Sequence, residues 1–518
     1  MKSKRGKSVR KAPKPTLGPA FLPVLILLAA LVFRIVSLST FDPLVDEKIT
    51  RDVVTGIWNG ELSNNWKYTV AEPEYRVDMY NFSSYMYADA LIAGLAGKLA
   101  ARLPNGDPDF VLWSRLFSAL AGTLAVYLFY LVARRLFGQG TAIVAMVLMA
   151  VMPLLVQDAH YARPEAFVLA LTAAAYLFLL RFDSHPGRLR YLGYSSFCFG
   201  LLIACKFSLI PMALLSIVFL APIRDRQGET PDKHGPFIRG IGVCAGGTLL
   251  GLFVGVSDAF FHPSAYWHGV QFLLHQYAGA SRPHAVIDGT NSVSLTALYF
   301  WQTTGLLLLF SMAGAFVLAM TRRFVLLAAL GGPVAFYLVY FSLQRTFFER
   351  NLSHVAPLMA ILAAVALTAL SEKIRVRSGP VALIALTALA AVPALWVSYK
   401  LVFIAMRTTT EQRAVNYQIG ILKTVRNRLD LAGSLFTDGQ FDQMMQLAKA
   451  PKSDYLVRVA DFHDSYTKNH LEELERQTKW REVGYFPSVF EGFDVNTMIA
   501  YHSVSFRYLF LSASSPAP

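Results

Sequence analysis

Long apolar runs recur along this chain from about residue 20 to about residue 400, and they constrain its fold more than any other feature. A run of about 20 mostly apolar residues can cross the hydrocarbon of a bilayer as a helix. Only 16% of the 518 residues are charged, whereas a soluble chain carries about a quarter. The sequence therefore predicts a mainly α, polytopic membrane protein.

Hydropathy places about eleven transmembrane helices in this region. Their approximate ranges are 19–40, 112–133, 140–157, 164–181, 191–208, 209–223, 238–256, 295–319, 324–342, 355–371 and 379–401. Lys and Arg cluster in the loops that share a side with the N-terminus, whereas the loop 41–111 carries more acids than bases. Basic loops face the cytoplasm, so we expect a cytoplasmic N-terminus and an outer loop 41–111. The net charge of +14 then follows from topology and does not indicate a nucleic-acid partner.

Composition divides the chain into three parts. Residues 1–18 are basic and contain no acid, residues 19–401 carry the apolar runs, and residues 402–518 alternate helix-like with strand-like stretches. A cleaved signal peptide is the alternative for the start, but the apolar run is long and lacks a small-residue cleavage site. We predict a cytoplasmic tail, a transmembrane catalytic module and a small extracytoplasmic α/β domain.

The outer loop 41–111 contains an apolar stretch at 84–103 that admits two interpretations. Counted as a span, it would reverse every later loop and put the basic pair Arg134-Arg135 outside, against the charge rule. The stretch also carries three charged residues, which suit a helix lying along the membrane surface. We therefore predict juxtamembrane helices in this loop.

Two adjacent carboxylates, Asp46 and Glu47, follow directly after the first apolar run. Acids at a membrane are costly, so such a pair is a functional-site hypothesis by default. With this topology, other polar residues in or near the spans fall mostly on the same outer side. They include Asp158, His160, Arg163, Glu165, Lys206, Arg345, Glu349, Arg350 and His354. Their co-location favours a reaction on a lipid-borne substrate whose charged headgroup lies at that depth.

Five stretches, taken in order, carry a resemblance to a known family. They are Asp46-Glu47; Trp113-Ser-Arg-Leu-Phe with Ala133-Arg-Arg-Leu-Phe-Gly138; Met152-Pro-Leu with His160-Tyr-Ala-Arg-Pro-Glu-Ala166; Gly200-Leu-Leu-Ile-Ala-Cys-Lys206; and Glu349-Arg-Asn-Leu-Ser-His with Pro357. Together they resemble the C-type (GT-C) polyprenyl-phosphate-sugar-dependent glycosyltransferases. Within these, the chain is similar to the branch of protein O-mannosyltransferases and the lipid A aminoarabinose transferase. The similarity covers roughly residues 20–400.

The chain departs from the family pattern at three places. Glu165 stands where the family more often has Asp, and Cys205 stands where Thr is usual. The His-Pro-Pro or Tyr-Pro-Pro signature of the first outer loop is absent, and Tyr80-Asn-Phe-Ser-Ser-Tyr85 stands in its place. The handling of the substrate by that loop is therefore open.

The resemblance implies an inverting glycosyltransferase that moves a hexosyl or pentosyl group from a polyprenyl-phosphate donor to an acceptor hydroxyl. The acceptor is a glycan, a lipid or a protein of the cell envelope, and the site faces outward from a plasma (bacterial inner) membrane. Asp46 is expected to be the general base, and Glu47 to orient it or the acceptor. Lys206 would neutralise the donor phosphate, assisted by Arg345 or Arg350. The supporting residues would be His160, Arg163, Glu165 and His354.

Each of these residues also has a structural interpretation. Asp46 could cap the helix predicted at 47–59, which does not exclude catalysis. Lys206 could reach toward the membrane surface without binding anything. Arg163 and Glu165 could form an ion pair at a helix start. The histidines could be hydrogen-bonding partners at the membrane interface.

No cofactor and no protein-held metal site are predicted, because spacings such as His-Glu-x-x-His are absent. A divalent cation between Asp46 and the donor phosphate stays an open alternative. A rival class is the secondary transporter, but transporters place polar residues at the bilayer midplane and contain internal repeats. Another rival is a non-catalytic partner in the assembly of envelope polysaccharide or glycolipid. The expected partners are the donor lipid, the acceptor and membrane lipids.

Overall fold

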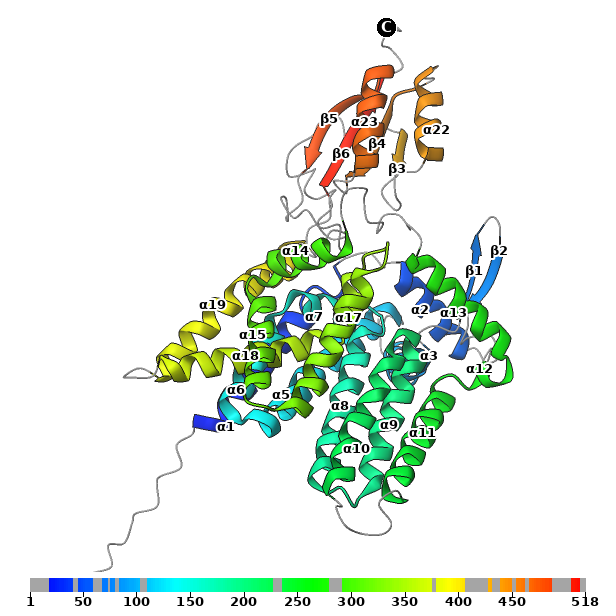
Figure 1. Cartoon of the computed structure of the whole chain (residues 1–518). Coiled ribbons are helices and arrows are strands. Elements are labelled where there is room, and N and C mark those ends of the chain that lie inside the picture. Colours follow the sequence, from blue (N-terminus) through cyan, green and yellow to red (C-terminus); the bar gives the residue numbers. More distant parts are fainter. Residues whose placement is uncertain are drawn as a thin grey trace, which may run out of the picture.

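Helices dominate the computed structural model of the chain, and a small sheet lies beyond one end of the helical bundle (Figure 1). The structure describes residues 18–40, 45–58, 68–72, 75–79, 83–102, 110–226, 235–278, 291–374, 379–405, 427–430, 438–449, 453–461, 465–486 and 505–512. The mainly α prediction is confirmed, and the apolar helices are those of a multi-pass membrane protein.

Six helical segments of the described chain are long and apolar enough to cross a bilayer. They are α5 (Phe110–Phe137), α8 (Glu165–Ser184), α11 (Gly235–Gly255), the run of α16 (Phe324–Leu326), η4 (Leu327–Gly331) and α17 (Gly332–Ser342), α18 (Ala356–Lys373), and α19 (Gly379–Lys400), which continues into η6 (Leu401–Ala405). A seventh crossing results if α14 (Ser292–Thr304) and α15 (Leu307–Met320) form one span, although they bend by 104°. Gly305 allows the bend, because its φ of 59° lies in the left-handed region that glycine tolerates.

Four further predicted spans coincide with shorter apolar helices. These are α1 (Gly18–Ile35), α6 (Gln139–Val151), α9 (Leu189–Cys205), and η3 (Phe207–Leu214) followed by α10 (Leu215–Arg226). A helix rises about 1.5 Å per residue, so the 17 residues of α9 cover about 25 Å of a core about 30 Å thick. The count of eleven crossings therefore stays a prediction, although every predicted range contains an apolar helix.

The segment after the first span contains more structure than the expected helices. α2 (Val45–Trp58) is followed by a hairpin of β1 (Tyr68–Glu72) and β2 (Tyr75–Met79), which the sequence did not predict. α3 (Ser83–Asp89), a π turn at Ala90–Gly94 and α4 (Leu95–Ala100) then form one helical run. The indole of Trp58 donates to the carbonyl of Ala90, and Ser84 donates to Leu201 of α9. These bonds fasten the run to the bundle, and its place at the membrane surface stays a prediction.

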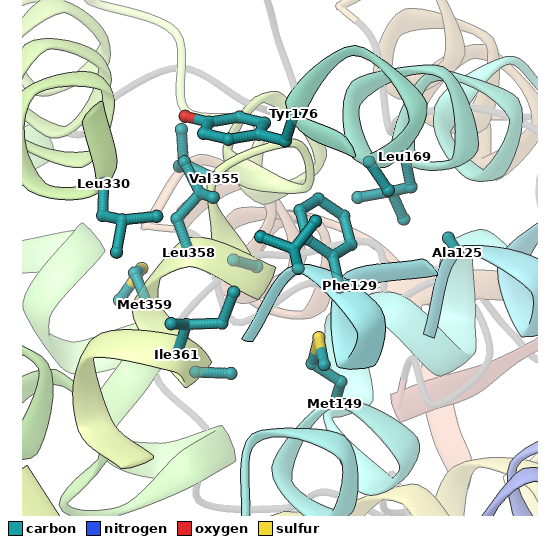
Figure 2. Packing of buried hydrophobic residues seen from close by; sticks show 14 of the residues in the cluster. Ala125, Phe129, Met149, Leu169, Tyr176, Leu330, Val355, Leu358, Met359 and Ile361 are labelled. Carbon is teal, nitrogen blue, oxygen red and sulfur yellow. The ribbon is translucent and has the colours of Figure 1, made fainter. Parts of the chain in front are cut away.

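The core of the bundle lies where α5, α6, α8 and α18 meet. Figure 2 shows Phe129, Met149, Leu169 and Met359 from these four helices pointing toward one another. The side chains fill the space with apolar atoms, so removal of any large one would leave a cavity. This packing fixes α8 and, through it, the turn that precedes α8.

Small residues bring α9 and α11 into close contact. A Cβ atom on Gly251 would collide with the carbonyl oxygen of Phe197, and one on Gly200 would collide with that of Thr248. Membrane helices commonly approach through small residues, because lipid provides no hydrophobic force between them. Backbone contact here sets the position of the end of α9, where Lys206 follows.

The C-terminal part folds around a mixed four-stranded sheet. Its elements are β3 (Asn427–Asp430), α22 (Asp438–Lys449), β4 (Tyr455–Asp461), α23 (Ser465–Gln477), β5 (Arg481–Phe486) and β6 (Ser505–Leu511). The strand order is β3-β4-β6-β5, with β3 parallel to β4 and the other pairs antiparallel. Trp480 is fully buried between helices and sheet, and its indole donates to Met444. The predicted α/β character of this part agrees with these elements.

Two glycines of α11 allow a matched test of the close approach. We expect Gly251→Ala to destabilise the protein by about 1–3 kcal/mol, because a methyl group has no room against Phe197. Gly246→Ala is the control, since a Cβ at that position meets nothing within 4 Å. Thermal unfolding in detergent measures both variants, and equal melting temperatures would contradict this account of the interface.

Candidate functional site

A short turn between α7 (Pro153–Asp158) and α8 gathers the polar residues of the bundle. It exists because a proline interrupts the preceding span: α6 ends at Val151, and Met152 is extended with ψ of 119°. Pro153 has no N–H and disfavours a helical residue before it, so the helix restarts at Pro153. Residues 159–164 then lead into α8, which begins at Glu165.

The break leaves backbone carbonyls at the end of α6 that need partners inside the bundle. Arg34 of α1, fully buried, donates from Nη2 to Met149 and from Nη1 to Ala150, both at 3.2 Å. Ser398 of α19 donates to Val151 at 2.8 Å. Two helices far apart in the sequence thus stabilise the interruption that positions the turn.

Glu47 is held in place by Arg115, a contact that the sequence analysis did not predict. Arg115 Nε and Nη2 donate to the two carboxylate oxygens of Glu47 at 2.8 Å each, and Arg115 Nη1 donates to Leu38 at 2.6 Å. The backbone N–H of Ala162 donates to Glu47 Oε1 at 2.9 Å. Both charged side chains are almost completely buried. Such a bidentate pair fixes the start of α2 against α5 and the turn.

Asp46 lies in the first turn of α2, directly before Glu47. The structure describes its backbone but not its side chain. Thr50, one helical turn later, donates to the carbonyl of Ala162 at 2.8 Å. Two side chains of α2, those of Glu47 and Thr50, therefore bond the backbone of Ala162 in the turn. The predicted role of Asp46 as base stays a prediction.

The other predicted residues of this region form a chain of alternating charges. Arg163 Nη2 lies 3.7 Å from Asp158 Oδ1, and Arg163 Nε lies 3.4 Å from Glu165 Oε2. Lys206 Nζ donates to Glu165 Oε1 at 2.7 Å. The side chains of Asp158, Arg163 and Glu165 are at most 2% exposed, whereas that of Lys206 is 14% exposed. The chain of charges therefore leads from the protein interior to a partly accessible ammonium group.

His160 connects the turn to α7 and to the segment after α1. Its Nδ1 lies 2.7 Å from the carbonyl of Val156, and its Nε2 lies 2.9 Å from the carbonyl of Val36. Burial lowers the pKa of His160 to about 4, so the ring is neutral at pH 7 and donates to one of these carbonyls. The supporting role predicted for this residue stays a prediction.

The connection before α18 supplies the other half of the cluster. The Ser353 hydroxyl bonds Asp158 Oδ2, and Gln157 Nε2 lies 3.5 Å from Glu349 Oε1. Arg350, in a short helix η5 (Glu349–Leu352), is half-buried over the ring of Phe348. Its charge also acts on Glu165. Burial raises the pKa of Asp158, and the charge of Glu165 raises it further.

The structure brings together most, but not all, of the predicted site residues. Glu47, His160, Arg163, Glu165, Lys206, Arg350 and His354 lie in or beside one polar cluster. Arg345 is exposed, and among the described residues no ion pair or hydrogen bond joins its side chain to that cluster. Its predicted role in phosphate binding stays untested.

Sequence reasoning missed Arg115, Ser353 and Gln157. Arg115 did carry a signal, because a charged residue inside the predicted span 112–133 is expected to have a partner or a function. Ser353 and Gln157 carried none, since their roles depend on where α7 and the connection before α18 meet. Within the described ranges, no group of three His, Cys, Asp or Glu side chains is placed to hold a metal ion.

Residues 105–243 match the family model of the dolichyl-phosphate-mannose-protein mannosyltransferases. This range includes Arg115, the turn and Lys206, but neither Asp46 nor His354. Among curated proteins, no match to the chain is found.

Two solved structures have a similar fold. The oligosaccharyltransferase of Archaeoglobus fulgidus matches with a TM-score of 0.52 and 15% identity, covering 87% of this chain. This chain spans only 58% of the length of that protein. ArnT of Cupriavidus metallidurans, bound to undecaprenyl phosphate, matches with a TM-score of 0.50 and 15% identity over 94% of this chain and 97% of its own. The family match and these folds confirm the resemblance to GT-C glycosyltransferases.

The Glu47–Arg115 pair can be compared with an exposed pair on the same helix. We expect Arg115→Leu to destabilise the protein by about 3–5 kcal/mol, because it leaves a buried carboxylate without its cation. Arg51→Leu, which breaks the exposed Arg51–Asp52 pair, should cost less than about 1 kcal/mol. The double variant Glu47→Gln/Arg115→Leu should recover part of the loss. Thermal unfolding tests this, and equal effects of the two single variants would refute it.

A second buried acid, Asp89, predicts a pH-dependent stability. It accepts a hydrogen bond from Ser114 at 2.6 Å, and burial raises its pKa to about 7. Between about pH 4 and pH 7 the folded state keeps a proton that the unfolded state releases, so stability falls as pH rises through this window. The gain in melting temperature from Asp89→Asn should therefore be larger at pH 8 than at pH 4.5. Asp52→Asn, on an exposed side chain, is the control.

Proposed function

We propose that this GT-C-like membrane protein is a glycosyltransferase that moves a sugar from a polyprenyl-phosphate donor to an acceptor hydroxyl. One observation carries the proposal: the same turn contacts the start of α2 and Lys206. Glu47 binds the N–H of Ala162, and Glu165, three residues later, binds Lys206. The turn thus contacts both α2, which carries the proposed base, and the proposed phosphate ligand, and these contacts support the proposal.

Lys206 and Arg350 are the proposed ligands of the donor phosphate. Lys206 follows the last residue of α9 in an extended conformation, and its ammonium is the partly accessible end of the charge chain. Arg350 is half-buried on the other side of the cluster. A leaving phosphate gains negative charge as its bond to the sugar breaks, and fixed cations in a desolvated site stabilise that charge. The undecaprenyl phosphate bound to ArnT supports a polyprenyl-phosphate ligand.

Asp46 is the proposed general base. It would accept the proton of the acceptor hydroxyl while that oxygen attacks the anomeric carbon from the side opposite the phosphate. The new carbon–oxygen bond forms as the sugar–phosphate bond breaks, which inverts the anomeric centre and releases polyprenyl phosphate. For this role the Asp46 carboxylate would face the turn before α8, which Thr50 contacts one helical turn later. No cofactor takes part in this scheme.

Glu47 is proposed to position Asp46 and not to react itself. Both of its oxygens accept hydrogen bonds from Arg115, and one also accepts from Ala162. A carboxylate held in this way is fixed in position. It would keep the first turn of α2 at a fixed distance from the turn before α8.

The membrane orientation follows from the charge of the loops. The basic loops favour a cytoplasmic N-terminus in a plasma (bacterial inner) membrane, which puts the cluster and the C-terminal sheet at the outer face. An outer acceptor of the cell envelope, whether lipid, glycan or protein, suits that side. The C-terminal domain is proposed to recognise this acceptor.

Asp46→Asn tests the proposed base. We expect it to lower transfer from a polyprenyl-phosphate sugar by at least about a hundredfold, because the amide cannot take up the proton. Binding of undecaprenyl phosphate and the melting temperature should change little. Asp52→Asn, in the same helix and exposed, should retain full activity. Unimpaired turnover by Asp46→Asn would exclude this residue as the base.

A further inference from the structure

A continuous path of contacts runs through one half of the polar cluster. Lys206 binds Glu165, which lies beside Arg163, and Arg163 pairs with Asp158. The hydroxyl of Ser353 then bonds the other oxygen of Asp158. These contacts connect the end of α9 with the connection that precedes α18.

The path returns to its beginning through His354, the residue after Ser353. The His354 ring packs edge-on against Tyr337 of α17, with 4.2 Å between the ring centroids. The Tyr337 hydroxyl donates to the carbonyl of Ser208 at 2.8 Å, only two residues after Lys206. The contacts therefore close into a ring that has Lys206 and His354 as members. Elements from three regions of the chain are needed to form it.

His354 has unused hydrogen-bonding capacity that no ion pair accounts for, whereas the unbonded atoms of Asp158, Arg163 and Glu165 lie in ion pairs. Its side chain is buried, with 4% of the residue exposed, and within the described part of the chain its Nε2 has no hydrogen-bond partner. A buried polar atom without a partner is costly, so such an atom suggests a ligand or a function. His160, also buried, has a backbone carbonyl oxygen within 2.9 Å of each ring nitrogen, so its N–H has a protein acceptor.

The protonation state of His354 defines what it can offer a ligand. Burial, aided by the charge of Lys206, lowers its pKa to about 3, so the ring is neutral at pH 7. A neutral imidazole has one N–H donor and one acceptor nitrogen. Beside the ammonium of Lys206, it adds direction to a binding site without adding charge.

We propose that His354 donates a hydrogen bond to a phosphate oxygen of the polyprenyl-phosphate donor, next to the Lys206 ammonium. This inference rests on the proposed function and adds a specificity residue to it. A sugar phosphodiester carries one negative charge, which the ammonium of Lys206 and one neutral donor can satisfy. The family match ends at residue 243, so it assigns no role to His354.

Three variants test the proposal. His354→Ala removes the donor, and His354→Gln retains an N–H donor of similar reach. Thr141→Val is the matched control, because it removes the hydrogen bond from the buried Thr141 hydroxyl to Thr368, and both residues are at least fourteen positions from any member of the ring. The full-length protein in detergent is titrated with undecaprenyl phosphate, and KM and kcat are measured with a polyprenyl-phosphate sugar.

We expect His354→Ala to weaken binding of undecaprenyl phosphate and to raise KM by about tenfold to a hundredfold, the value of a hydrogen bond to a charged group. His354→Gln should restore a large part of the affinity, whereas Thr141→Val should change only the melting temperature. Unchanged binding and KM in a folded His354→Ala variant would overturn the proposal. Loss of affinity in both His354→Ala and Thr141→Val to the same extent would do so too.

The binding measurement separates this inference from the proposed function. If the protein transfers no sugar but His354→Ala still weakens binding of undecaprenyl phosphate, the His354 contact is supported and the assigned reaction is excluded. If the unmodified protein transfers sugar and His354→Ala retains the affinity and KM of that protein, the reaction is supported and the His354 contact is excluded.

Discussion

The carboxylate of Glu47 is the contact on which the rest of the cluster depends. Inside a helical bundle, a turn exposes backbone groups that neither water nor a neighbouring strand can satisfy. Glu47 satisfies the N–H of Ala162 while Arg115 neutralises its charge, so the turn before α8 is fixed without a net buried charge. A weaker partner would leave Arg163 and Glu165 without a defined position. The polar site is thus built on an ion pair that is itself fully enclosed.

The alternating charges beyond this turn explain why one cation is accessible. Buried ions are tolerated when each has an opposite charge and hydrogen bonds nearby. Asp158, Arg163 and Glu165 meet this condition among themselves and with Ser353. Lys206 ends the series and has only one described carboxylate neighbour, which leaves part of its ammonium able to meet an anion. An entering phosphate would share Lys206 with Glu165 and would not require a new cation.

The sequence could predict the location of the site because hydrophobicity and charge are local properties. The apolar runs fall on apolar helices, and the turn and helix ends between them gather His160, Arg163, Glu165 and Lys206. Two features of the fold could not be predicted from local sequence patterns. The bend at Gly305 depends on the left-handed backbone of a single residue, and the hairpin β1–β2 has no strong pattern in its short strands.

Pairing between distant residues was likewise hidden in the sequence. Glu47 and Arg115 are 68 positions apart, and Asp158 and Ser353 are 195 apart. Which acid meets which cation depends on how the helices pack, and this is decided by contacts such as those of Gly251 with Phe197. Arg345 illustrates the limit: it lies five residues before Arg350, yet it is exposed while Arg350 turns toward the cluster.

The contacts of the buried Arg34 depend on a segment that is synthesised much later than Arg34 itself. Its guanidinium lies in the first described helix, but its acceptors at Met149 and Ala150 follow 115 and 116 positions later. Before α6 is synthesised, only the carbonyl of Ala30 in its own helix is available to it. A guanidinium with so few partners is costly at bilayer depth. Insertion of the start of the chain is therefore completed only when a much later segment enters the membrane.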